Sequence, residues 1–262
     1  MKIGVLLKQV PASDTRVKID SPTAGISTAD VKWEINAYDE FALEEGLKLR
    51  DAGKATEVIV FTLGGADAEQ RIRDALARGA DRAVRLDDPS FAGSDSLGVA
   101  RALAAAAKAE GVELILAGKQ AIDDDNGQVP AMVAEILDWP QALVVDKLEI
   151  DNGRFKAWRV SGGGVRDVLE GPLPAVIAAT KGLNEPRYAS LKGIMAAKRK
   201  GLTVVNASAL GVGGAVGASA SVVTTTNFSL PADRPKGRIL TGDNPTVVAE
   251  LVRLLREEAK VI

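Results

Sequence analysis

The chain has 262 residues, of which 46% are hydrophobic and 26% charged, and its formal net charge is −2. This composition excludes global disorder, and the small net charge gives no general attraction to nucleic acid or to an anionic membrane. The chain contains no cysteine and no histidine, which excludes disulfides, imidazole metal sites and Ser/His or Cys/His catalysis. We therefore predict no catalytic residue and no metal site.

The amino terminus begins with an apolar run, MKIGVLLKQVP, that Lys8 interrupts too early for a signal peptide. No apolar run elsewhere reaches membrane-spanning length. We expect a cytoplasmic protein without membrane insertion.

Strand and helix signals alternate through the first part of the chain. Short apolar runs predict buried strands at residues 2–10, 57–65, 82–86 and 112–118. Apolar residues at helical spacing predict helices at residues 37–53, 67–80, 94–111 (capped by Ser94 or Asp95) and 127–139. Repeated strand–helix units indicate an α/β fold with a mostly parallel, doubly wound sheet.

The pattern changes after Pro140. Residues 142–150 and 154–171 read as antiparallel strands. Asp151–Gly153 supplies a hairpin turn between the two stretches, and the three glycines Gly162–Gly164 predict a second reversal within the latter. The run at residues 173–180 predicts one more buried strand.

Beyond residue 200 the chain has little to pack against by itself. Residues 207–223 are rich in small side chains and are predicted to be irregular, and residues 230–244 read as a loop. A last helix has Asn244 as its predicted cap and Pro245 at its first position. We predict one α/β domain over residues 1–200 and a carboxyl-terminal arm, residues 201–262, that packs on a partner subunit.

Loops at the carboxyl ends of the predicted strands form a candidate ligand site. They are residues 8–14, 63–67 and 118–128, and residues 36–39 open the first helix beside them. Glycines and helix amino termini in these loops offer free N–H groups, as a mononucleotide site made mostly of backbone donors requires. Ordinary caps and turns are the alternative, since there is no Walker A motif and no complete GxGxxG.

Three consecutive acids, Asp123–Asp125, would repel a phosphate if all pointed at it. Some must cap the following helix or face solvent, which leaves N–H groups and Lys119 for the anion. A carboxylate metal cluster is disfavoured, because consecutive residues do not easily converge on one ion. The three tryptophans are interpreted as core anchors rather than stacking platforms: Trp33, Trp139 and Trp158.

Residues 183–200, LNEPRYASLKGIMAAKRK, follow an apolar strand and are locally basic. Pro186 ends the strand, and Ser190 is a candidate cap for a short helix. One interpretation is a solvated helix that buries its apolar side chains, Leu191, Ile194 and Met195. The other is an apolar anchor ringed by cations, which would bind an acidic protein surface with a hydrophobic pocket. The cations are Lys192, Lys198, Arg199 and Lys200.

Several long stretches resemble the β subunit of electron-transfer flavoprotein over nearly the full length. They are GKQAIDDD followed by LDWPQA, LPAVIAATKGLNEPRYASLKGIMAAKRK, and ALARGADRAVRL. The resemblance implies a Rossmann-like fold of adenine-nucleotide-binding type with antiparallel additions and an extended carboxyl-terminal arm. It also implies an electron carrier that is no catalyst by itself, in a heterodimer whose one FAD is held mainly by the α subunit. Such a carrier accepts electrons from acyl-CoA dehydrogenases of fatty acid β-oxidation, or other flavoprotein dehydrogenases, and passes them through a quinone oxidoreductase to the respiratory chain.

The resemblance also assigns residues. It places AMP in the β subunit at Leu6, Asn36, Ala37, Tyr38, Asp39, Leu63, Gly64, Gly118, Lys119, Gln120, Ala121, Ile122, Asp123, Asp124, Asp125, Asn126, Gly127, Gln128 and Val129. It makes Leu191 the anchor that enters a pocket on a dehydrogenase, within a recognition surface of Tyr188, Leu191, Ile194, Met195 and Lys198.

Two stretches depart from the family pattern. Lys192-Gly193 stands where many relatives have Pro-Asn, and residues 126–130 replace a Cys-Asn-Gln-Thr-Gly-like sequence. Asp123–Asp125 resemble the AMP-binding type rather than electron-bifurcating relatives, which oxidise NADH and hold a second FAD in β. A stand-alone nucleotide-binding protein of the stress type is the remaining alternative, and it would leave residues 183–200 unexplained.

Overall fold

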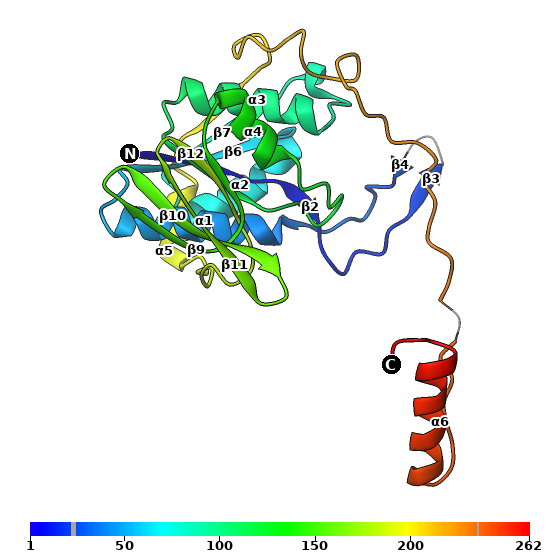
Figure 1. Ribbon diagram of the computed structural model, residues 1–262. Coiled ribbons are helices and arrows are strands. Elements are labelled where there is room, and N and C mark those ends of the chain that lie inside the picture. The colour runs from blue at the N-terminus through cyan, green and yellow to red at the C-terminus, as the bar shows by residue number, and fades with distance from the viewer. Residues whose placement is uncertain (22–24, 235) are drawn as a thin grey trace. The chain divides into compact units, whose positions relative to one another are not determined.

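The computed structural model describes residues 1–21, 25–234 and 236–262. The chain divides into two compact units, one of Met1–Val17 with Ser27–Thr226 and the other of Lys18–Ile26 with Asn227–Ile262 (Figure 1). The first unit contains the central sheet and its helices.

Nine strands of the described residues form this sheet, in the order β11-β10-β9-β12-β8-β1-β6-β7-β13. Neighbouring strands from β9 to β13 along this order are parallel, and β10 and β11 add an antiparallel edge. The bounds are β1 Lys2–Leu6, β6 Glu57–Leu63, β7 Arg82–Leu86, β8 Leu114–Gly118, β9 Gln141–Asp151, β10 Arg154–Gly162, β11 Val165–Pro172, β12 Ala175–Ala179 and β13 Leu202–Val205.

Helices cover both faces of the sheet, which confirms the predicted doubly wound α/β class (Figure 1). α1 (Ala37–Asp51) and α2 (Glu69–Arg78) lie on one face, and α3 (Ser96–Ala109) and α4 (Val129–Leu137) lie on the other. Side chains of β6 alternate between the two cores, because successive residues of a strand point to opposite faces. A short helix, α5 (Leu191–Ala197), packs against α2.

Helix α1 lies close against the middle of the sheet. A Cβ added to Gly46 would stand 3.4 Å from Val5 Cγ2 and 3.5 Å from both Ile3 Cγ2 and Leu116 Cδ1. Alanine would fit here in ordinary van der Waals contact, but a side chain longer than alanine would have to push the helix away from β1 and β8.

The strand order reverses at β1. From β1 the chain proceeds to β6 and β7 on one side, and then returns to β8 on the other. The carboxyl ends of β1 and β8 therefore form a topological switch point, where ligands of open α/β sheets bind.

Several local predictions need correction. The strand expected at residues 2–10 is split into β1 and β2 (Gln9–Pro11), because the Lys8 N–H bonds to the Asp39 carboxylate at 2.8 Å instead of continuing a ladder. β2 pairs with β5 (Trp33–Ile35) in a separate small sheet. Trp158 is not a core anchor, since it is only half-buried and lies beneath the amine of Lys147, 3.9 Å from its ring centroid. Trp33 is likewise half-buried. Trp139 is half-buried too, but it packs against the hydrophobic core as predicted.

Other predictions are confirmed. Asn152 and Gly153 both have positive φ, as the hairpin between β9 and β10 requires. Asp95 rather than Ser94 caps α3, because its carboxylate accepts from the Gly98 N–H at 2.9 Å. β13 was not predicted, and the short 3₁₀ turns η1 (Ala66–Ala68) and η2 (Pro89–Phe91) precede α2 and α3.

The second unit contains β3 (Ile19–Ser21), β4 (Gly25–Ile26) and α6 (Asn244–Glu257). The cap position of α6 is Asp243, so the prediction of Asn244 is wrong by one residue. The loop predicted at residues 230–244 includes residue 235, which lies outside the described residues. No side chain of α6 is buried, and its apolar residues Val248, Leu251 and Val252 are exposed. None of the described helices combines the length and the apolarity needed to cross a membrane.

Candidate functional site

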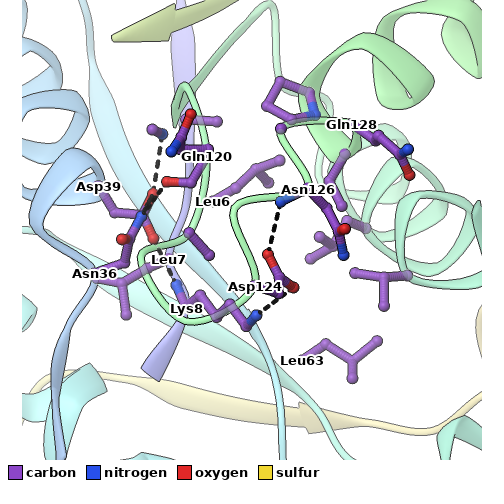
Figure 2. Close-up of a pocket in the computed structure, with 18 residues that line it drawn as sticks. Leu6, Leu7, Lys8, Asn36, Asp39, Leu63, Gln120, Asp124, Asn126 and Gln128 are labelled. Carbon is purple, nitrogen blue, oxygen red and sulfur yellow. Dashed lines mark hydrogen bonds and ion pairs between the residues drawn. The ribbon is translucent and has the colours of Figure 1, made fainter. Parts of the chain in front are cut away.

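A cavity of about 210 Å³ lies at the carboxyl ends of β1, β6 and β8, at the switch point of the sheet (Figure 2). The predicted residues that line it are Leu6, Asn36, Asp39, Leu63, Gly118, Gln120, Ala121, Asp124, Asn126, Gly127, Gln128 and Val129. Lys8 also lines the cavity, and it begins the loop 8–14 that the sequence placed at the site. The lining residues outside the predicted loops are Leu7, Val99, Leu103, Ala117 and Pro130. The predicted residues outside the lining are Ala37, Tyr38, Gly64, Lys119, Ile122, Asp123 and Asp125.

Asp39 joins three of the loops that surround this cavity. One carboxylate oxygen accepts from the Lys8 N–H at 2.8 Å, and the other accepts from Asn36 Nδ2 at 2.9 Å and the Gly118 N–H at 3.0 Å. Lys8 follows β1 and Gly118 ends β8, so a side chain in the first turn of α1 ties the two central strands together at their carboxyl ends (Figure 2).

Asn36, the residue that precedes α1, fixes the loop that follows β8. Its Nδ2 donates to the Gln120 carbonyl at 2.9 Å, and its Oδ1 accepts from the Ile122 N–H at 3.1 Å. The side chain is buried, so each of these bonds replaces a contact with water that folding removes. Asn36 therefore fixes the loop that forms part of the cavity wall, and it does so by neutral hydrogen bonds alone.

Position 118 has no room for a side chain. A Cβ added to Gly118 would lie 2.6 Å from Tyr38 Cβ and 2.8 Å from the Tyr38 carbonyl carbon, and it would also collide with the Asp39 carboxylate. Glycine is required here because the backbone of β8 passes directly against the first turn of α1.

Burial raises the pKa of the Asp39 carboxyl to about 7, although the hydrogen bonds from Lys8, Asn36 and Gly118 act in the opposite direction. Asp39 is thus a titratable group at neutral pH directly beneath the cavity.

Lys8 is the cation at the mouth of the cavity. Its Nζ lies 2.8 Å from Asp123 Oδ1 and 3.0 Å from Asp124 Oδ2. Burial lowers the pKa of the Lys8 amine, but its hydrogen bonds to these two carboxylates outweigh burial and raise the pKa above its ordinary value. Asp125 accepts from Gln120 Nε2 at 2.6 Å. Asp123 and Asp124 therefore share the amine of Lys8, whereas Asp125 bonds to Gln120.

Lys119, the cation that the sequence assigned to the anion, lies beside Tyr38. Its Nζ lies 4.8 Å from the centroid of the Tyr38 ring, outside the cavity lining. The signal for Lys8 was present in the sequence, because Lys8 is the first residue of the predicted site loop 8–14. Among residues 1–21, 25–234 and 236–262, no three His, Cys, Asp or Glu side chains are grouped as a metal site would need.

The amino terminus of α4 opens into the cavity. Gln128 stands at the cap position, and no side chain caps the helix. Gln128, Val129 and Pro130 line the cavity, so free N–H groups and the positive end of the helix dipole face it. Pro130 lacks an N–H, which leaves one donor fewer than an ordinary first turn would offer.

In residues 183–200, Ser190 caps α5 as predicted, with its Oγ accepting from the Gly193 N–H at 3.0 Å. The apolar side chains are not buried in this chain: Tyr188 is 93% exposed, Leu191 85%, Met195 65% and Ile194 45%. The interpretation in which this helix buries Leu191, Ile194 and Met195 is therefore wrong. Lys198 lies beside them and is also exposed.

Comparison with known proteins places the chain in a family. A model of the electron transfer flavoprotein domain matches residues 23–210. The chain belongs to the electron transfer flavoprotein family. It is 41% identical over 263 residues to electron transfer flavoprotein subunit beta of Bradyrhizobium diazoefficiens, and the match covers 100% of both chains. The subunit beta of Bacillus subtilis is 38% identical over 268 residues, again across 100% of both chains. The human subunit beta is 39% identical over 215 residues, 81% of this chain and 84% of the human protein.

Membership in the electron transfer flavoprotein family implies electron transfer by a flavin and an electron carrier rather than a classical catalyst. A chain without cysteine or histidine agrees with this, because the electrons must travel on a cofactor.

Proposed function

We propose that this chain is the β subunit of a heterodimeric electron transfer flavoprotein whose α subunit holds most of one FAD. The observation that carries the proposal is the apolar face of α6, where Val248, Leu251 and Val252 repeat at helical spacing and are not covered within their own unit. A partner chain would cover this face. We assign residues 227–262 as the arm that packs on the α subunit, because residues 201–226 belong to the unit of the central sheet, with β13 paired to β7. That first unit is the nucleotide-binding domain in this proposal.

In this proposal AMP occupies the cavity at the switch point. The open amino terminus of α4 supplies N–H donors for the phosphate. Lys8 lines the same cavity, where its amine is paired with Asp123 and Asp124. The apolar residues Leu6, Leu63 and Val99 offer contact surface for the base. AMP would fill the cavity and stabilise the loops around it, and it would take no part in electron transfer.

The exposed residues of 183–200 form the docking surface in this proposal. Leu191 inserts into a pocket on an acyl-CoA dehydrogenase or another flavoprotein dehydrogenase, and Lys192 and Lys198 attract an acidic rim around that pocket. Electrons pass to the FAD and then to a quinone oxidoreductase of the respiratory chain.

The test is to express this chain with and without the α chain of the same organism, and then to measure molecular mass and to release and identify bound nucleotides. We expect a 1:1 heterodimer with one FAD and one AMP. Two FADs per heterodimer together with NADH oxidation would instead establish the bifurcating type. A stable homo-oligomer that ignores the α chain would establish a stand-alone nucleotide-binding protein.

A further inference from the structure

The base of the 183–200 segment is fixed to α1 by a bidentate ion pair. Arg187 Nε donates to Glu44 Oε2 at 2.8 Å, and its Nη2 donates to Glu44 Oε1 at 2.9 Å. The Arg187 backbone N–H also donates to Glu44 Oε2, at 3.1 Å. Glu44 is buried, so this one carboxylate holds both the backbone and the side chain of Arg187.

Two further contacts attach the same stretch to α1. Asn184 Nδ2 donates to the Phe41 carbonyl at 3.0 Å and to Glu45 Oε2 at 2.9 Å. Arg187 Nη1 donates to Asp51 Oδ2 at 2.9 Å. Residues of α1 from position 41 to position 51 therefore hold the chain just before the exposed side chains begin.

The other end of the segment is fixed to α2. A Cβ on Gly193 would collide with the Ala77 carbonyl, so α5 lies directly against the end of α2. Arg73 Nη1 donates to the Ala197 carbonyl at 2.9 Å, and Lys200 Nζ donates to the carbonyls of Leu76 at 2.9 Å and Ala80 at 2.6 Å. The Lys200 amine therefore satisfies carbonyl groups at the carboxyl end of α2. It does not join the ring of cations that the sequence predicted around the apolar anchor.

Tyr188 and Leu191 are the most exposed large apolar side chains between these two fixed ends. Binding a partner through a flexible segment would cost the entropy of ordering it, whereas a segment held at both ends is already ordered. We propose that Arg187 is a positioning residue for docking: through Glu44 it holds Leu191 in the orientation in which a dehydrogenase binds it. This inference rests on the docking role proposed for Leu191.

The test uses the complete heterodimer with its FAD, reduced by a medium-chain acyl-CoA dehydrogenase that is supplied with its acyl-CoA. Arg187→Met alone would leave Glu44 as a buried carboxylate without its partner, which lowers stability. The second variant, Glu44→Gln with Arg187→Gln, removes both charges and avoids this. Arg159→Met, at an exposed arginine of β10, is the matched control.

For both Arg187 variants we expect the KM for the heterodimer to rise about tenfold with the maximal rate changed less than about twofold, because the flavin is untouched. In a Leu191→Ala background the same substitutions should have little further effect, since Arg187 acts through Leu191. An unchanged KM, or losses that multiply in the double variants, would overturn the assignment of Arg187. A Leu191→Ala variant that couples normally would instead contradict the proposed docking role.

Discussion

The Gly118 N–H donates to the Asp39 carboxylate at 3.0 Å, and this contact joins the carboxyl end of β8 to the first turn of α1. The bond forms because position 118 has no side chain, since a Cβ there would lie 2.6 Å from Tyr38 Cβ. The packing of α1 on the sheet and the shape of the cavity therefore depend on the same two residues.

Gly118→Ala is expected to destabilise the protein by about 1–3 kcal/mol, as overpacking of a close contact does. It should also weaken AMP binding, because α1 and the loop at residues 118–128 must separate. Urea unfolding and calorimetric titration with AMP measure the two effects. Gly213→Ala is the control, because a Cβ at Gly213 meets no atom within 4 Å. Equal stability of the two variants would contradict the steric argument.

The free energy of unfolding is expected to depend on the protonation of Asp39. Because its pKa is raised from 3.8 to about 7, the folded protein keeps the proton to higher pH than the unfolded chain does. The contribution of Asp39 to the free energy of unfolding is therefore complete below pH 3.8 and is lost as the pH rises to about 7. Over this range the free energy of unfolding falls by at most about 1.4 kcal/mol per pH unit from this group.

Urea titrations of wild type and Asp39→Asn at pH 5, 6, 7 and 8 give the free energy of unfolding at each pH. The contribution of Asp39 is the difference between the pH dependences of the two proteins. An amide resembles the protonated carboxyl, because each group has one accepting oxygen and one donating group, but the amide does not ionise. The stability of the variant should therefore fall less steeply than that of wild type between pH 5 and 7. Parallel pH profiles would show that Asp39 does not titrate in this range.

Lys8→Met is expected to weaken AMP binding about tenfold, since it removes the cation at the mouth of the cavity and leaves Asp123 and Asp124 without their partner. Lys119→Met should change the affinity less than about twofold, because its amine lies over the Tyr38 ring. Calorimetric titration of both variants decides between the two lysines. The reverse order of effects would restore the assignment that the sequence favoured.

Leu191→Ala is expected to reduce the coupling with a dehydrogenase about tenfold or more, since a fully buried leucine contributes roughly 1.5–3 kcal/mol. The heterodimer and its flavin content should not change. Reduction of the flavin by an acyl-CoA dehydrogenase is the measurement, and the rate with wild type should also fall as salt is raised. Unchanged kinetics would remove Leu191 from the docking role.

Leu251→Asp is expected to prevent assembly with the α subunit, because it places a charge in the centre of the apolar face of α6. The yield of heterodimer in co-purification measures this. Arg256→Gln changes an exposed charged residue of the same helix and should leave the yield unchanged. A normal yield of the Leu251 variant would show that α6 is not part of the interface.

Much of the fold could be predicted from the sequence. Continuous apolar runs and glycine-terminated helices are strong local signals, and they identified the parallel sheet and the edge where the loops meet. β13 was missed because it is a short edge strand, and the break between β1 and β2 because it depends on a distant carboxylate, that of Asp39.

The site was predicted less completely, for two physical reasons. Val99 and Leu103 reach the cavity from α3, and which helix lies beside a crevice is set by the winding of the chain rather than by local pattern. Lys8 and Lys119 both follow a central strand, but the Lys119 N–H bonds to the Ala179 carbonyl at 2.9 Å and the side chain turns towards Tyr38. Side-chain direction in a loop depends on such contacts, which the sequence does not reveal.

The close packing of α1 on the sheet at Gly46 limits the substitutions that this helix can accept. The first turn of α1 contains Asp39, and its later turns contain Glu44 and Glu45. The loops around the cavity and the 183–200 segment are therefore both hydrogen-bonded to the same helix. A substitution that tilts this helix would disturb the proposed nucleotide site and the proposed docking of a dehydrogenase together. A substitution in α1 must therefore satisfy two sites at once, one at the first turn of the helix and one along its middle.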